Sequence, residues 1–110
     1  MADRAERVAR NEALFRDVNE LIAEAASRWA TERALVICEC AREVCVETIE
    51  IDAAEYEAVR SHGDRFVVRD GHEEPEFERV VERGDRFVVV EKTGEGSRIA
   101  RDLDPRAEGG

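Results

Sequence analysis

All three cysteines of the chain lie within the eight-residue segment Cys38-Glu39-Cys40-Ala41-Arg42-Glu43-Val44-Cys45. Zinc takes four ligands in a tetrahedron, with sulfur at about 2.3 Å, so its ligands converge from short loops held by rigid elements. Cys38 and Cys40 point the same way from one strand end, and Cys45 returns from the next strand across the tip of the loop. The spacing therefore predicts three of the four ligands of a metal site.

The fourth ligand has to come from elsewhere in the chain, which contains two histidines. We favour His72, because it follows Asp70-Gly71 in a predicted tight turn just after a strand. His62 is the alternative, although an imidazole at a helix end more often lies exposed beside the helix dipole. The predicted metal is Zn²⁺, because an iron–sulfur cluster needs four thiolates. The predicted ligands are Cys38, Cys40, Cys45 and His72.

Two other chemistries are open to the same residues. A nucleophilic or redox cysteine needs nearby positive charge to lower its pKa, but Glu39, Glu43 and Glu47 surround these thiols. We therefore favour a metal, with inert buried cysteines as a further alternative.

A zinc hydrolase would need an open coordination position, where Glu73 beside His72 could act as general base. Glu73 or water is also the remaining candidate for the fourth ligand. Because the chain has no His-Glu-x-x-His motif, we favour a structural site without catalytic activity.

The elements that must position this site begin with an amphipathic helix over residues 10–31. Its apolar residues recur every three or four positions and form a stripe of Phe15, Val18, Leu21, Ile22, Ala25 and Trp29. We expect this stripe to pack on the protein's own sheet. The alternative is that it pairs with a partner helix or with a second copy of the chain.

Strands are predicted at residues 35–38, 46–51, 66–68, 79–83 and 86–90. The first two form a hairpin whose tip is the cysteine loop. Between the second and third strands, Asp52 and Glu55 form a capping box for a short helix that buries Tyr56 and Val59 and ends at a left-handed Gly63. Residues 73–83 fit either helical or strand spacing. We favour a hairpin of residues 79–83 and 86–90, with a type II′ turn at Gly84, over a helix.

These elements predict one α+β domain over residues 11–93. A long amino-terminal helix packs on a small antiparallel sheet, and zinc joins the first hairpin tip to the loop at His72. Residues 1–10 are expected to form a flexible amino terminus. From residue 94 to 110 glycine, charge and Pro105 dominate, so this segment is expected to be a disordered tail.

Four stretches of the chain resemble a family of small bacterial proteins with no assigned activity. They are Phe15-Arg16-Asp17-Val18-Asn19-Glu20, the Cys38 to Cys45 loop, Glu55-Tyr56-Glu57-Ala58-Val59-Arg60 and Gly71-His72-Glu73. The similarity covers about residues 10–92. The resemblance implies that His72 belongs with the cysteines. The chain departs from the family at Asp70, where a proline often precedes the glycine.

The charge of the chain restricts its partners. The formal net charge is -10, and residues 34–60 hold seven acids against Arg42 and Arg60. Nucleic acid would be repelled, since contacts of Lys and Arg with phosphate supply most of the nonspecific affinity of proteins for nucleic acid.

The sequence also contains no predicted membrane span or secretion signal. Charges interrupt every apolar run that could span a membrane, and the first residues lack the apolar core of a secretion signal. We therefore expect a cytoplasmic interaction or regulatory module whose partner is another protein with a basic surface.

Overall fold

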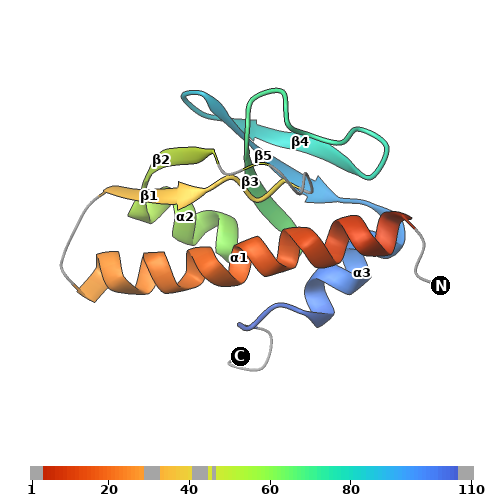
Figure 1. Cartoon of the computed structure of the whole chain (residues 1–110), viewed down its shortest axis with the longest axis horizontal. Helices are drawn as coiled ribbons and strands as arrows, with labels where there is room; N and C mark the ends of the chain where they lie inside the picture. The colour runs from red at the N-terminus through yellow and green to blue at the C-terminus, as the bar shows by residue number, and fades with distance from the viewer. Residues whose placement is uncertain (1–3, 29–32, 41–44, 46, 107–110) are drawn as a thin grey trace.

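A long helix lies beneath two small antiparallel sheets in the computed structural model (Figure 1). The structure describes residues 4–28, 33–40, 45 and 47–106, and for residues 25–28 only the backbone. In chain order the elements are α1 (Arg4–Arg28), β1 (Arg33–Ile37), β2 (Thr48–Asp52), α2 (Ala53–Arg60), β3 (Arg65–Arg69), β4 (Glu78–Arg83), β5 (Phe87–Lys92) and α3 (Gly94–Asp102). The predicted α+β class is confirmed.

The two sheets follow the predicted strand pairs. β1 pairs with β2 in an antiparallel hairpin, and β5 lies between β3 and β4 in the second sheet. Ile49 and Ile51 are buried and Glu50 between them is exposed, because successive side chains of a strand point to opposite faces. The β4–β5 pairing confirms the hairpin predicted for residues 79–83 and 86–90, so residues 79–83 form a strand and not a helix. The core between sheets and helices includes Val36, Phe66 and the three cysteines.

α1 turns a different face to the sheets from the one that its apolar periodicity predicts. Val18 and Leu21 of the predicted stripe are exposed, and Phe15 and Ile22 are only partly buried. Trp29 and the side chain of Ala25 lie outside the described residues. Among residues 4–24 of α1, the buried ones are Val8, Ala9, Glu12, Ala13, Arg16 and Asn19. The prediction that the whole apolar stripe packs on the sheet is therefore wrong. The helix also begins at Arg4, so that residues 4–10 belong to it rather than to a flexible segment.

Specific polar contacts allow α1 to bury this mixed face. The Arg16 guanidinium donates to the carbonyl oxygens of Gly63 at 2.6 Å and Ala100 at 2.8 Å, and it lies 4.7 Å from the centre of the Phe66 ring. The Asn19 amide donates to the Ile37 carbonyl at 2.7 Å and accepts from the Ile37 N–H at 2.8 Å. Because buried polar groups cost free energy unless they are hydrogen-bonded, these contacts fix both the rotation and the position of α1.

α2 follows β2 directly, with Asp52 as its N-cap residue. The predicted capping box is wrong, because the Asp52 side chain makes no cap bond and instead accepts from Arg33 at 2.8 Å. Tyr56 and Val59 are buried, as predicted. Gly63 does not take the predicted left-handed conformation. It packs closely against α3, where a side chain would have little room.

The predicted disordered tail is wrong for residues 94–106. α3 packs against α1, and its Ile99 is buried. After α3, Asp104 forms an ion pair with the buried Arg60, and Arg106 donates to Glu20 at 2.6 Å. Sequence composition alone missed this segment because its stability comes from ion pairs with distant elements rather than from a long apolar run.

The turn between β4 and β5 differs from the predicted type II′ geometry, which needs a positive φ at Gly84. Among the described residues, Arg86 is the non-glycine residue with a positive φ, at 68°, and Gly84 has none. The Gly84 N–H donates to the Phe87 carbonyl at 2.9 Å. The Phe87 ring fills the space that a side chain on Gly84 would occupy. Glycine is therefore required there for close approach.

This turn predicts opposite effects for two substitutions. Arg86→Gly should raise the free energy of unfolding by up to about 1 kcal/mol, because a left-handed non-glycine residue costs roughly 1–2 kcal/mol and the freer unfolded chain cancels part of the gain. Gly84→Ala should lower it by about 1–3 kcal/mol, because the new methyl group overlaps the Phe87 ring. Urea unfolding measures both changes, and shifts of the same sign would contradict this description of the turn.

Candidate metal centre

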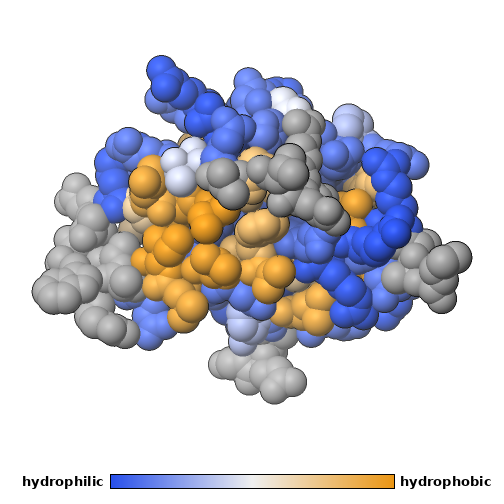
Figure 2. Space-filling view, viewed as in Figure 1, coloured by the Kyte–Doolittle hydropathy of each residue, from blue (hydrophilic) through white to orange (hydrophobic). Residues whose placement is uncertain are grey.

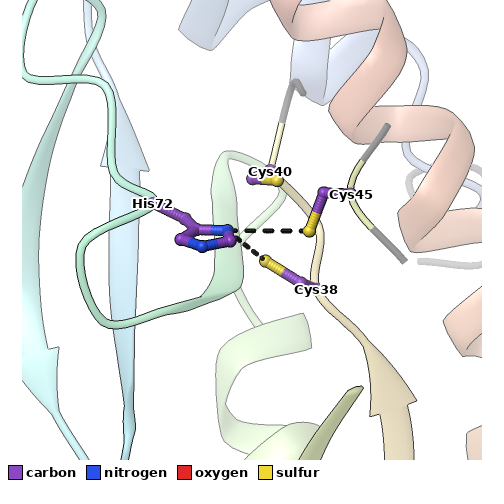
Figure 3. Close-up of side chains that lie close together, drawn as sticks. All are labelled: Cys38, Cys40, Cys45 and His72. Carbon is purple, nitrogen blue, oxygen red and sulfur yellow. Dashed lines mark hydrogen bonds between the residues drawn. The ribbon is translucent and has the colours of Figure 1, made fainter. Parts of the chain in front are cut away.

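Four side chains from three segments converge beside the hairpin of β1 and β2. The His72 Nδ1 atom lies 3.6 Å from the Cys38 Sγ and 3.6 Å from the Cys45 Sγ. Cys40 completes the group, and the four donor atoms lie within 4.8 Å of one another. Figure 3 shows the His72 ring directed toward the three thiols. The structure thus brings together the four residues that the sequence analysis selected.

The donor set fits a tetrahedral metal ion. Metal–sulfur bonds of about 2.3 Å and metal–nitrogen bonds of about 2.0–2.1 Å imply sulfur–nitrogen separations of about 3.5–3.6 Å and sulfur–sulfur separations of about 3.8 Å. The two sulfur–nitrogen distances agree with this geometry. None of the three cysteines forms a disulfide bond. The group is therefore compatible with a metal-binding domain.

Main-chain hydrogen bonds hold the segments that carry these donors. Cys38 directly follows β1, and its N–H donates to the Glu47 carbonyl at 2.8 Å, across the hairpin. His72 lies in a turn after β3, closed by its N–H donating to the Arg69 carbonyl at 2.9 Å. Gly71 in this turn has a φ of 92°, a conformation that favours glycine. The sequence signal Asp-Gly-His therefore marked a real turn.

Glu47 orients the His72 ring. Its carboxylate lies 3.0 Å from the His72 Nε2 atom, on the opposite side of the ring from the thiols. A carboxylate that accepts from Nε2–H leaves the Nδ1 lone pair free for a metal, as is common for metal-binding histidines. In the sequence, Glu47 is evident only as negative charge near the cysteines. Glu47 directly precedes β2 and lies opposite the turn of His72, a spatial relation that no local sequence signal carries.

The thiols themselves are buried. The Arg69 N–H donates to the Cys38 Sγ at 3.2 Å, a contact that would stabilise a thiolate. A hydrogen bond with Cys40, together with burial, raises the pKa of Cys38, and burial raises the pKa of Cys45. The raised pKa values disfavour the thiolate forms of Cys38 and Cys45 when no metal is bound, which argues against a reactive cysteine at these two positions. A bound cation would reverse this, because it stabilises the thiolate directly.

The Glu39 side chain points into the core between the two cysteines that flank it. It is fully buried, and its carboxylate accepts from the Asn19 amide at 2.8 Å, the Tyr56 hydroxyl at 2.9 Å and the Val67 N–H at 2.9 Å. Burial raises the pKa of Glu39, while these three donors oppose that rise. Glu39 therefore anchors the cysteine segment to α1, α2 and β3.

The two alternative site residues lie elsewhere. His62 is exposed at the end of α2 and is not part of the group of donor atoms. The Glu73 carboxylate accepts from the N–H of Gly71 at 2.8 Å, within its own turn, and does not belong to the group either. In the part of the chain that the structure describes, the cluster thus consists of three sulfur donors and one nitrogen donor.

No protein-family model, curated protein or solved structure matches the chain significantly. The resemblance to small bacterial proteins stays a prediction. Among the described residues, no helix has the length and apolar character needed to cross a bilayer. The assignment of the site therefore rests on its own geometry.

The contact between Glu47 and His72 makes a prediction about metal affinity. Glu47→Ala should lower the affinity for zinc by about 10–100-fold, because the ring loses the acceptor that fixes its orientation. Competition with a chromophoric chelator measures this affinity. Glu50→Ala, at an exposed glutamate of the same hairpin, is the matched control. Equal affinities of the two variants would contradict an orienting role for Glu47.

Proposed function

We propose that the protein is a small zinc-binding domain in which a Cys3His site stabilises the fold. The observation that carries this proposal is the pair of 3.6 Å distances from one imidazole nitrogen to two thiols, with the other nitrogen held by Glu47. Three sulfurs and one imidazole suit zinc, a borderline-soft ion that accepts both donor types in a tetrahedron. A four-thiolate iron–sulfur cluster would need another cysteine.

A closed site supports a structural role for the metal rather than a catalytic one. A catalytic zinc keeps one position for water and needs a base beside it. Glu73 was the candidate base of a zinc hydrolase, but its carboxylate is engaged with the Gly71 N–H. The four donors of the group are sufficient for a tetrahedral ion without water. We therefore propose a non-catalytic domain.

The proposed biological role is protein interaction or regulation, with a partner that presents a basic surface. The chain has a net charge of -10, and Glu47, Glu50, Glu55 and Glu57 are exposed on the segment around β2 and α2. Such a surface attracts cationic partners and repels phosphate backbones. A cytoplasmic location is part of the proposal, because a reducing compartment keeps the three thiols available for zinc.

Removal of any ligand should destabilise the domain. Cys38→Ser, Cys40→Ser, Cys45→Ser and His72→Ala should each lower zinc content and melting temperature, because metal that binds only the folded chain adds its binding free energy, on the order of 10 kcal/mol, to folding. His62→Ala is the matched control and should change neither quantity. X-ray absorption should find three sulfurs, one nitrogen and no oxygen at the zinc. Loss of zinc in His62→Ala but not in His72→Ala would refute the ligand set.

The charge of the surface predicts a salt-sensitive partner. Partners captured by the zinc-loaded protein should be released as ionic strength rises, because exposed charges are screened beyond about 8 Å at physiological salt. Reversing charge with Glu50→Lys and Glu55→Lys together should weaken capture at low salt. Capture that is unchanged in high salt and in this double variant would exclude a basic partner for the acidic segment.

A further inference from the structure

α1 buries charged side chains on the face that it turns to the sheets, whereas hydrophobic residues gather on the outer face of α1 and β1 (Figure 2). The side chains of Glu12 in α1, Glu78 in β4 and Lys92 in β5 are fully buried. The Lys92 Nζ atom lies 2.9 Å from the Glu12 Oε1 atom and 3.2 Å from the Glu78 Oε1 atom. We call these three residues the buried charge cluster. It joins the first half of α1 to the end of β5, which lie side by side in Figure 1.

The buried charge cluster contains more acid than base. Two carboxylates and one ammonium together carry a net negative charge, and all three side chains are closed to solvent. A buried charge that is not compensated costs far more free energy than a buried neutral group. One proton bound to either carboxyl makes the cluster neutral overall. The cluster is therefore a place where the folded protein can hold a proton.

Hydrogen-bond geometry identifies Glu12 as the carboxyl that holds this proton. Glu78 is satisfied as a carboxylate, because it accepts from the Lys92 Nζ at 3.2 Å and from the Glu74 N–H at 2.9 Å. Neither oxygen of Glu12 accepts a hydrogen bond from the described residues, although Lys92 lies close by. A protonated carboxyl needs fewer donors and can itself donate. Burial and the nearby Glu78 carboxylate raise the pKa of Glu12 well above its ordinary value, and Lys92 offsets only part of this rise.

Ion pairs and hydrogen bonds occupy charged groups on the elements packed around the cluster. Arg16, one turn further along α1, donates to the carbonyl oxygens of Gly63 and Ala100. Helix α3 approaches Lys92 through Gly96, which has no side chain. The ion pairs are Arg4 with Glu76, Arg10 with Glu6, Glu91 with Arg65 and Arg79, Arg98 with Glu95 and Asp102, and Arg101 with Asp64. The charges that act on the Glu12 carboxyl are those of Glu78 and Lys92.

We propose that the buried charge cluster binds one proton and that this proton controls the docking of α1 on the β4–β5 hairpin. With the proton on Glu12, the cluster is neutral overall and can remain closed to solvent. Loss of the proton to water leaves two carboxylates with one ammonium, and the cluster then gains stability by opening so that water reaches Glu12. Because the pKa of Glu12 is raised in the folded protein, its contribution to stability is present at low pH and is lost as pH rises through that pKa.

Carboxyl ¹³C NMR of the zinc-loaded protein tests the proton site directly. One glutamate carboxyl should titrate well above the ordinary value of about 4.3, and this titration should be absent from Glu12→Gln. Lys92→Met should move it to higher pH, because the ammonium that favours the carboxylate is gone. Glu82→Gln, at an exposed position of β4, is the matched control and should leave it in place. A high titration that survives in Glu12→Gln, or glutamates that all titrate in the ordinary range, would overturn the proposal.

Unfolding measurements test whether the proton controls docking. Glu12→Gln is neutral at every pH, so the natural protein should unfold more readily than this variant as pH rises. The ratio of the two unfolding constants should grow by up to about tenfold per pH unit until the pKa of the folded state is reached. Both proteins carry the same cysteines and His72, so the pH dependence of metal binding cancels from the ratio. A ratio that does not change with pH would refute control by the proton.

Hydrogen exchange locates the effect in the structure. The protection factors of the α1 amides near Glu12 should fall over the same pH interval in the natural protein and stay constant in Glu12→Gln. Equal pH dependence in the two proteins would contradict a role of the proton in docking α1. Zinc content should be the same in both, so a negative result here leaves the proposed metal site unaffected.

Discussion

The arrangement of the segments that carry Cys38, Cys40, Cys45 and His72 depends on the buried carboxylate of Glu39. It accepts from α1 through Asn19, from α2 through Tyr56 and from β3 through the Val67 N–H. Because successive residues of an extended segment point to opposite sides, a Glu39 anchored inward leaves Cys38 and Cys40 on the other side of the chain. One core interaction therefore fixes the direction of two of the three thiols. The spacing of the cysteines alone does not set the direction of their side chains.

The polar core and the apolar surface of α1 have one common cause. Asn19 and Arg16 bind main-chain atoms of β1, of α3 and of the loop before β3, so that the helix is held by specific hydrogen bonds rather than by its most apolar residues. Such contacts orient a helix more strictly than nonpolar packing, since each buried polar group left without a partner costs about 1–3 kcal/mol. The apolar residues are then free to face outward.

The strands, the two hairpins and the convergence of Cys38, Cys45 and His72 were predictable, because alternation and turn residues act locally. The buried face of α1 was not predictable, since amphipathic periodicity assumes that the apolar residues are the buried ones. Arg16 is buried instead, because it donates to main-chain acceptors far away in the sequence. α3 was missed for a similar reason: Asp104 and Arg106 are held by ion pairs to Arg60 and Glu20. The role of Glu47 depends on how the residue before β2 lies relative to the turn after β3, which the sequence alone does not show.

The Arg69 N–H that donates to Cys38 has a further consequence for the outer side of β3. β3 pairs with β5 on one side only, and on the other side its Val67 and Arg69 N–H groups are occupied by Glu39 and Cys38. The cysteine segment thus closes what would otherwise be an open edge strand, the feature of a sheet through which chains aggregate. Detachment of this segment would uncover two unpaired donors next to the apolar run Phe66-Val67-Val68. Retention of the cysteine segment on β3 is therefore also a safeguard against edge-to-edge aggregation.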